Sequence, residues 1–433
     1  MSWIQKYASR VVTAADAVRN IQDGNRIFLT GNVSVPSTLL AALVDYAPNL
    51  KDVEICQALT VGAADYVSEA MQGHLRVNTM FISANVREAV HQGRADFTPV
   101  LLSEFPLLFK RGILPVDAAL IHVSPPDEHG FCSFGVEVGL SKSPAECARI
   151  ILAEVNEQMP RTLGDSFIHV SRLNYMVPVD YPLPALAMSE EGGGETTEKI
   201  ARSCADLIPD GATMQMGIGA IPDAVLNFLY DKKDLGVHTE LFSDGVIDLV
   251  EAGVLTSSQK TLHPGKIVAG FILGTQRLYD WVDDNPLIEM HPTEYVNDPF
   301  IIAQNRRMVA INSAIEVDLT GQVCADSIGP KLYSGVGGQL DFIYGASRSE
   351  GGVPIIALPS TTRKDTITRI VSTLKPGAGV VTTRNHVRFV VTEFGIADLY
   401  GKTIRQRAQA LINVAHPNFR DELTAAAKEL NYL

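Results

Sequence analysis

Short apolar segments and amphipathic segments alternate along most of the chain. Apolar runs such as residues 118–123 and 354–358 have the length of buried strands. Residues 196–207 and 404–413 instead repeat apolar positions at the spacing of a helix, with polar residues between them. Strands that alternate with such helices are typical of βαβ units, so the pattern predicts an α/β fold with parallel or mixed sheets.

The same succession of elements occurs twice. An Ile-x-Asp-Gly turn, a short apolar strand, a glycine and, five residues later, a proline precede a predicted helix in both halves. The glycine and proline are Gly31 and Pro36 in the first copy and Gly217 and Pro222 in the second, where we predict a helix over residues 223–229. Further matches follow in the same order, which indicates two duplicated α/β domains. These are residues 79–86 with 239–246, and 127–130 with 318–321.

A proline-rich and then glycine-rich segment marks the expected join between the domains. Pro182 and Pro184 disfavour a helix, and the three glycines at 192–194 allow the backbone to turn freely. We therefore expect an N-terminal domain over residues 1–185 and a C-terminal domain over residues 195–433.

Composition narrows the class of protein. The chain has 433 residues, of which 46% are hydrophobic and 20% charged, with a formal net charge of −13. A net charge this negative argues against nucleic-acid binding, which needs a basic surface, and leaves room for local basic pockets. The five cysteines are odd in number and show no C-x-x-C spacing, so we expect reduced thiols in a cytoplasmic protein. The N-terminus does not have the pattern of a signal peptide, and the apolar tract at 99–115 is too short and too charged to span a membrane.

One position breaks the symmetry of the duplication. Glu240 corresponds to Met80 in the alignment of residues 239–246 with 79–86. A glutamate at the end of a strand is ordinarily solvated or caps a helix. A carboxylate that only one copy carries, at the strand end where α/β proteins bind ligands, instead favours a role in chemistry.

Three further segments could contact a ligand. The glycines of residues 215–222 and 335–342 expose backbone amides, which can face an anion or a developing oxyanion, although plain turns explain them as well. The segment 360–364 adds Arg363 and Lys364, which can contact phosphate or remain solvated. Residues 215–222 are not a dinucleotide fingerprint, because Pro222 replaces the third glycine.

Taken together, residues 217–222, 238–245 and 335–342 resemble the acetyl-CoA hydrolase/transferase family of CoA-transferases. The resemblance extends over nearly the whole chain, and within the family it is strongest to 4-hydroxybutyrate CoA-transferases and butyryl-CoA:acetate CoA-transferases. It implies a CoA-transferase-like fold of two domains. It also implies that Glu240 is the nucleophile and forms an acyl-glutamyl anhydride and then a glutamyl-CoA thioester. A carboxylate is ionised at neutral pH and needs no general base, in agreement with the lack of a G-x-S-x-G motif.

The resemblance also assigns CoA-contacting positions. They correspond to Gln215, Met216, Gly217, Ile218, Gly219, Ile315, Gly338 and Lys364. Asp365 beside Lys364 leaves the last match ambiguous by one position. In the N-terminal domain, Asn32, Val33 and Ser34 are candidates to line an acyl pocket.

The resulting hypothesis is a cytoplasmic CoA-transferase that exchanges CoA between a short-chain acyl-CoA and a carboxylate such as acetate. Acyl-CoA and the carboxylate are its expected partners, with no permanently bound cofactor, no metal, no nucleic acid and no membrane; a homodimer is expected from relatives. The histidines lack metal-ligand spacing. An acyl-CoA hydrolase and a non-catalytic acyl-CoA sensor remain the alternatives.

Overall fold

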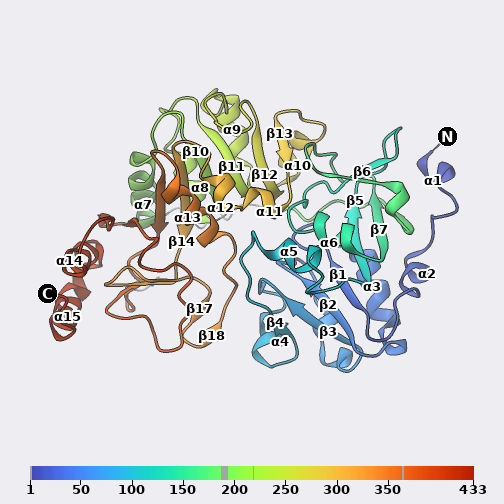
Figure 1. Ribbon diagram of the computed structural model, residues 1–433, viewed down its shortest axis with the longest axis horizontal. Helices are drawn as coiled ribbons and strands as arrows, with labels where there is room; N and C mark the ends of the chain where they lie inside the picture. The colour runs from blue at the N-terminus through green and yellow to red at the C-terminus, as the bar shows by residue number, and fades with distance from the viewer. Residues whose placement is uncertain (1, 187–193, 218, 363–364) are drawn as a thin grey trace. The chain divides into compact units, whose positions relative to one another are not determined.

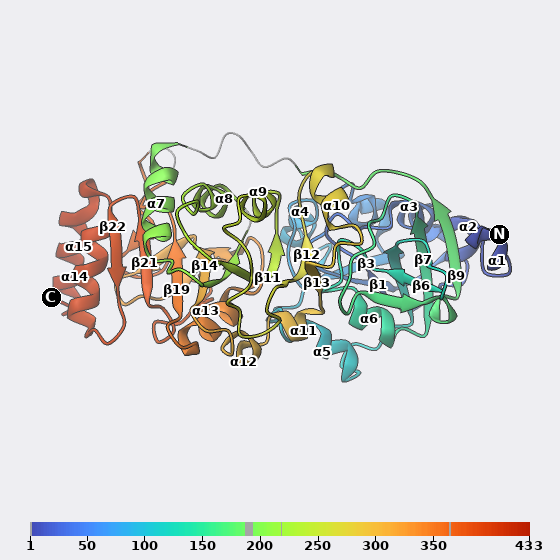
Figure 2. The same ribbon diagram turned by 90° about the horizontal axis from the view of Figure 1, so that it is seen from above.

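The computed structural model describes residues 2–186, 194–217, 219–362 and 365–433 (Figures 1 and 2). Contacts within the chain divide it into two compact units. Unit 1 comprises Met1–Leu186 and Val268–Val296, and unit 2 comprises Ala187–Ile267 and Asn297–Leu433. Each unit is built around one central sheet.

The sheet of unit 1 has seven strands in the order β4-β3-β2-β1-β5-β7-β9, and all of its pairs are parallel. Its central strands are apolar and buried, as expected for a parallel sheet covered on both faces. The strands are β1 (Arg26–Leu29), β2 (Val53–Gln57), β3 (Leu75–Thr79), β4 (Asp96–Phe97), β5 (Ala118–Val123), β7 (Ile150–Asn156) and β9 (Tyr175–Val179).

Helices cover both faces of this sheet, with α3 and α4 on one side and α5 and α6 on the other (Figure 2). The helices of the first segment are α1 (Trp3–Lys6), α2 (Ala14–Val18), α3 (Ser37–Tyr46), α4 (Arg87–His91), α5 (Phe105–Lys110) and α6 (Lys142–Cys147). Proline at position 36 offers no side-chain cap to α3. Instead, Glu154 of β7 accepts a hydrogen bond from the Leu39 amide at 2.6 Å, which satisfies one donor at the helix start.

The second segment of unit 1 and a small two-stranded sheet complete that unit. The small sheet pairs β6 (Phe131–Ser133) with β8 (Phe167–His169) in antiparallel orientation. The segment contains β12 (Ile267–Ile272), α10 (Gln276–Val282), β13 (Ile288–Met290) and α11 (Thr293–Val296). The Gly139 amide donates to the Gly270 carbonyl at 2.8 Å, and the Thr293 amide donates to the Gly139 carbonyl at 3.0 Å. Backbone hydrogen bonds therefore hold this segment to the first one.

Within unit 2, strands follow the order β11-β10-β14-β19-β21-β22. All of these pairs are parallel except the last, which is antiparallel, so the sheet is mixed. The strands are β10 (Thr213–Met216), β11 (Gly236–Phe242), β14 (Met308–Ser313), β19 (Val353–Ala357), β21 (Phe389–Thr392) and β22 (Gly395–Asp398). Smaller sheets contain β15 (Glu316–Asp318), β16 (Val323–Cys324) and β20 (Ile370–Val371), and β17 (Ser327–Ile328) with β18 (Lys331–Leu332).

In Figure 2, α7, α8 and α9 lie on one face of the unit 2 sheet, and α12 and α13 lie on the other. The helices are α7 (Glu195–Asp206), α8 (Ala220–Leu226), α9 (Gly245–Glu251), α12 (Pro299–Ile302), α13 (Gln339–Arg348), α14 (Ile404–Val414) and α15 (Pro417–Glu429). Within the described residues, none of the helices combines the length and apolar character needed to cross a bilayer.

The predicted fold class, duplicated α/β domains with parallel or mixed sheets, is confirmed. The bounds of one helix were predicted wrongly. We expected a helix over residues 223–229, whereas α8 spans Ala220–Leu226 and includes Pro222 in its first turn. Proline is tolerated there because the first amides of a helix have no partner within the helix.

Candidate active site

The carboxyl ends of β10 and β11 bring two of the predicted site segments together. These strands are parallel, with Met214 opposite Val237. The same register places Gly217 level with Glu240, three positions farther along each strand. The Thr239 hydroxyl donates to the Met216 carbonyl at 3.2 Å, which ties the two strand ends at this level. The predicted nucleophile therefore lies beside the predicted glycine loop.

Glu240 has one hydrogen-bonding neighbour of particular interest. Asn297 Nδ2 donates to Glu240 Oε2 at 3.0 Å, and the glutamate side chain is only partly exposed. Burial raises the pKa of Glu240, while the hydrogen bond from Asn297 acts in the opposite direction by stabilising the carboxylate. A more basic carboxylate is a stronger nucleophile as long as it is ionised.

Gly338 approaches the same carboxylate closely. A Cβ atom at this position would lie 1.9 Å from Glu240 Oε2 and 2.3 Å from Asn297 Nδ2, so a side chain here would displace both groups. Gly338 is also the N-cap residue of α13. The carboxylate thus lies at the positive end of a helix of ten residues, where backbone amides favour negative charge.

Two buried glutamines connect the strand ends and α13 around this point. Gln339 Nε2 donates to the Ser313 carbonyl at 2.6 Å, and Gln339 Oε1 accepts from Thr382 at 3.0 Å. Gln215 is fully buried, and its Oε1 accepts from Asn312 Nδ2 at 3.1 Å. The Gln339 contacts attach the start of α13 to the end of β14, and the Gln215–Asn312 contact joins β14 to β10.

The glycine loop after β10 leaves space beside its backbone. Gly219 has φ 123° and ψ 176°, a conformation open essentially to glycine alone. Among the described atoms, a Cβ at Gly219 would meet nothing within 4 Å, and one at Gly217 would meet only Pro222 Cγ, at 4.0 Å. Met216 is buried, and Ile218 lies outside the described residues. The two described glycines therefore combine accessible backbone with open space.

Of two other predicted CoA-contacting residues, Ile315 and Lys364, the structure describes only the first. Ile315 lies between β14 and β15, and its amide already donates to the Cys324 carbonyl at 2.8 Å. Lys364 lies outside the described residues. Just before it, Ser360 donates through its amide and its hydroxyl to the carboxylate of Glu393, at 2.9 and 2.6 Å, which anchors the start of that basic segment.

In unit 1, the counterpart of Glu240 is part of the core. Met80 is 3% exposed. The side chains of Asn32, Val33 and Ser34 are also buried, and Asn32 Nδ2 donates to Glu137 Oε2 at 3.3 Å. The two copies of the repeat thus share a backbone plan but differ in the chemistry at the strand end.

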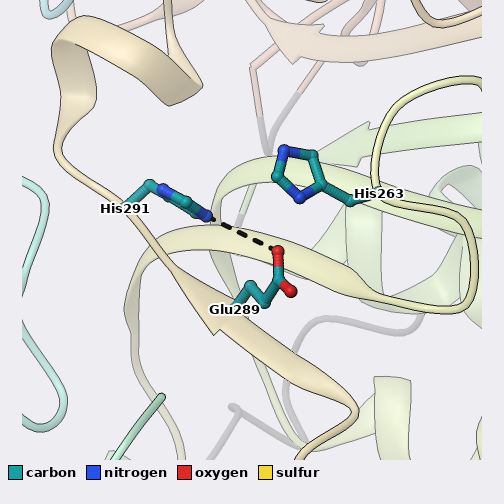
Figure 3. Close-up of side chains that lie close together, drawn as sticks. All are labelled: His263, Glu289 and His291. Carbon is teal, nitrogen blue, oxygen red and sulfur yellow. Dashed lines mark ion pairs between the residues drawn. The ribbon is translucent and has the colours of Figure 1, made fainter. Parts of the chain in front are cut away.

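Four of the histidines, whose spacing in the sequence does not indicate a metal site, lie in varied environments. His122 is buried, which lowers its pKa to about 3 and keeps the ring neutral. His129 is exposed. On and after β13, Glu289 Oε2 and His291 Nε2 lie 3.7 Å apart within unit 1, as the dashed line in Figure 3 shows; His263 in the same view belongs to unit 2.

Comparison with known proteins decides the family. The model of the acetyl-CoA hydrolase/transferase N-terminal domain matches residues 1–185, and that of the C-terminal domain matches residues 274–427. The chain belongs to the acetyl-CoA hydrolase/transferase family. The resemblance inferred from the glycine and glutamate motifs is thereby confirmed.

Members of the acetyl-CoA hydrolase/transferase family resemble the chain over nearly its whole length. The 4-hydroxybutyrate coenzyme A transferase of Clostridium kluyveri is 52% identical, over 98% of both chains. The succinyl-CoA:acetate/propanoyl-CoA:succinate CoA transferase of Fasciola hepatica is 49% identical, over 94% of this chain and 85% of its own length. The crystal structure of 4-hydroxybutyrate CoA-transferase from Porphyromonas gingivalis matches with a TM-score of 0.86 and 39% identity, over 99% of this chain and 100% of that one.

Asn297 belongs to the candidate site, but it was not predicted from the sequence. It lies 57 positions from Glu240, and no part of the duplicated motifs includes it. A segment rich in turn-forming residues, Asn297-Asp298-Pro299, was the available signal, but it indicates a helix start as readily as a site.

Proposed function

We propose that the chain is a CoA-transferase that exchanges CoA between a short-chain acyl-CoA, such as 4-hydroxybutyryl-CoA or butyryl-CoA, and a carboxylate such as acetate. One observation carries the proposal: the partly buried carboxylate of Glu240 lies between the Asn297 amide and the N-terminus of α13, with accessible glycine backbone on the neighbouring strand end. An ionised carboxylate in that position can attack a thioester without a general base.

The reaction proceeds in two symmetrical halves. A Glu240 oxygen attacks the acyl carbonyl, and the C–S bond breaks to give an acyl-glutamyl anhydride and CoA thiolate. The thiolate attacks the glutamyl carbonyl, releases the first carboxylate and leaves glutamyl-CoA. A second carboxylate attacks glutamyl-CoA, and the same steps in reverse deliver its CoA ester and regenerate Glu240. No net proton or electron transfer is needed.

The glycine backbone has a defined part in this scheme. Each attack produces a transient oxyanion, and backbone amides that are already oriented stabilise such charge without reorganisation. We assign this role to the start of α13 at Gly338 and to the loop of Gly217 and Gly219. Gln215, Met216, Ile218, Ile315 and Lys364 complete the proposed CoA-contacting set, with Lys364 close to phosphate.

The deciding experiment uses Glu240→Gln, which keeps the size of the side chain and its ability to accept from Asn297. We expect exchange of CoA between butyryl-CoA and acetate to fall to background, and hydroxylamine to trap a glutamyl adduct at position 240 in the unaltered protein only. A variant that still turns over, or an unaltered protein that gives no adduct, contradicts the proposal.

The same assay separates the alternatives. If CoA is released at the full rate without any acceptor acid, the protein is a hydrolase. If acyl-CoA binds but neither exchange nor adduct formation occurs, it is a binding protein without catalysis. A panel of acetate, butyrate, succinate and 4-hydroxybutyrate as acceptors then defines the preferred acid.

The proposal includes the setting in which the enzyme works. We propose an N-terminal domain over residues 1–185 on the acyl side, a C-terminal domain over 195–433 that carries Glu240, a cytoplasmic location and a homodimer. Light scattering of the purified full chain tests the last point, since a mass of one chain excludes the dimer.

A further inference from the structure

One side chain ties together the two turns that flank Glu240. Asp223 lies in α8, and its backbone amide donates to the Gly219 carbonyl at 3.1 Å. Burial raises the pKa of its carboxyl to about 6, which a hydrogen bond from the Gly219 backbone partly offsets. The Ser243 hydroxyl donates to Asp223 Oδ1 at 3.4 Å. Gly219 belongs to the turn after β10, and Ser243 lies three residues beyond Glu240 in the turn after β11. The carboxylate therefore bridges the segments that follow two neighbouring strands.

The turn after β10 depends on such an anchor. Gly219 adopts its extended, positive-φ backbone without a side chain to pack, and the space beside it is open among the described atoms. Backbone of this kind gains little from van der Waals contact, so its hydrogen bonds decide where it stays. The Asp223 carboxylate supplies one of these hydrogen bonds from the side of the turn that faces α8 and α9, called here the supporting side.

The supporting side, by contrast, is closely packed. A Cβ at Gly245, the first residue of α9, would lie 2.5 Å from Leu226 Cδ1 at the end of α8. Ser243 is only 5% exposed. The contact between α8, which holds Asp223, and α9, which begins two residues after Ser243, thus forms a firm base, while the space beside Gly219 is open among the described atoms.

We propose that Asp223 is a positioning residue of the transferase: it holds Gly219, and with it the glycine turn, at the level of Glu240, so that a bound CoA thioester meets the carboxylate in line. This inference rests on the proposed function. The Asp223 carboxylate contacts the two turns through Gly219 and Ser243, so its proposed role is exerted through the turn. Sub-ångström placement matters here because displacement of a reacting group by 1 Å can cost about a hundredfold in rate.

Kinetics of the two half-reactions test this role. We expect Asp223→Ala to lower kcat/KM for butyryl-CoA about 10- to 100-fold, through slower attack and weaker binding at the displaced turn, and to lower kcat/KM for acetate less, because CoA is already covalently held in the second half-reaction. Asp223→Asn keeps an oxygen that can accept from Gly219 and Ser243, so it should stay within about tenfold of the unaltered enzyme. Ser243→Ala should give a smaller loss of the same kind.

The matched control is Asp206→Asn, at an exposed acid at the end of the neighbouring helix α7, which should leave both half-reactions unchanged. If Asp223 only stabilised the fold, kcat/KM would fall equally in both half-reactions. The loss of activity in the Ala and Asn variants would then parallel the loss in their melting temperatures. That result, or unaltered butyryl-CoA kinetics in Asp223→Ala, overturns the positioning role.

Failure of the positioning role is distinguishable from failure of the proposed function. Inactive Glu240→Gln together with normal Asp223→Ala kinetics refutes only the positioning role. Active Glu240→Gln refutes the transferase mechanism. Calorimetry can then still measure how tightly the glycine turn binds butyryl-CoA, by comparing Glu240→Gln with the double variant that also carries Asp223→Ala. Equal affinities of the single and the double variant overturn the role of Asp223.

Discussion

At the scale of single residues, two opposing influences act on the pKa of Glu240, the proposed nucleophile. Burial favours the protonated form of Glu240 and so raises its pKa, whereas Asn297 donates a hydrogen bond to the carboxylate and favours ionisation. Attack on a thioester requires the ionised form, but basicity increases nucleophilic strength. The hydrogen bond from Asn297 therefore partly offsets the effect of burial on the pKa of Glu240.

Removal of the Asn297 amide should change the pH dependence of exchange. In Asn297→Ala the opposing hydrogen bond is lost, so the pKa of Glu240 should rise further and the acid limb of kcat/KM against pH should move to higher pH. Activity is then lost mainly at the acid end and recovers as pH rises. Asn385→Ala, at an exposed asparagine, is the control. An acid limb that stays in place, or moves to lower pH, contradicts this interpretation of the contact.

At the scale of elements, the start of α13 and the end of β11 meet at the carboxylate of Glu240. Gly338 permits this approach because an added Cβ would overlap both Glu240 Oε2 and Asn297 Nδ2. Gln339, the first residue of the helix, forms side-chain hydrogen bonds with Ser313 and Thr382, so the start of α13 cannot easily move away from Glu240. A side chain at position 338 must therefore be accommodated by moving the glutamate.

Gly338→Ala should accordingly impair catalysis far more than folding. We expect exchange to fall by about a hundredfold or more, the consequence of an ångström-scale shift of the carboxylate, with a much smaller change in melting temperature. Gly194→Ala provides the comparison, because a Cβ there meets no described atom within 4 Å. Activity close to normal in Gly338→Ala would show that the carboxylate does not need its present position.

The same elements show what could be predicted from sequence. The amphipathic pattern of residues 196–207 and 404–413 located α7 and α14 to within one residue at each end, since their apolar faces pack on the sheet. The glycines before α13 were equally compatible with an anion-binding backbone and with a plain turn, and the start of α13 at Gln339 was not predicted, because glycine disfavours the helix interior. The contact with Asn297 depends on tertiary packing across 57 positions, which no local pattern encodes.

At the scale of the whole molecule, unit 1 contains buried carboxyl groups. Burial raises the pKa of Glu137 to about 8 and that of Glu154 to about 7. The Leu140 amide and Asn32 donate to Glu137, and Tyr181 donates to Glu154, but these hydrogen bonds offset burial only in part. Both acids are therefore easier to ionise in the unfolded chain than in the folded one.

This difference links the stability of unit 1 to pH. A folded-state pKa above the unfolded value means that the stabilising contribution is complete below the unfolded pKa, near 4.5, and is lost as pH rises through about 7 to 8. His122 acts in the opposite direction, since its lowered pKa makes the folded state less stable as pH falls below 6.5. The effect of the two carboxyls is therefore isolated above pH 6.5.

Between pH 6.5 and about 8, the free energy of unfolding of unit 1 should decrease, by up to about 1.4 kcal/mol per pH unit for each titrating group. Both tryptophans, Trp3 and Trp281, belong to unit 1, so tryptophan fluorescence during urea denaturation follows that unit, whereas circular dichroism follows both. Glu137→Gln should flatten the dependence, because an amide cannot ionise and Asn32 can rotate its unpartnered Oδ1 toward it. Glu69→Gln, at an exposed acid, should leave the dependence intact, and an unchanged slope in Glu137→Gln would exclude Glu137 as its source.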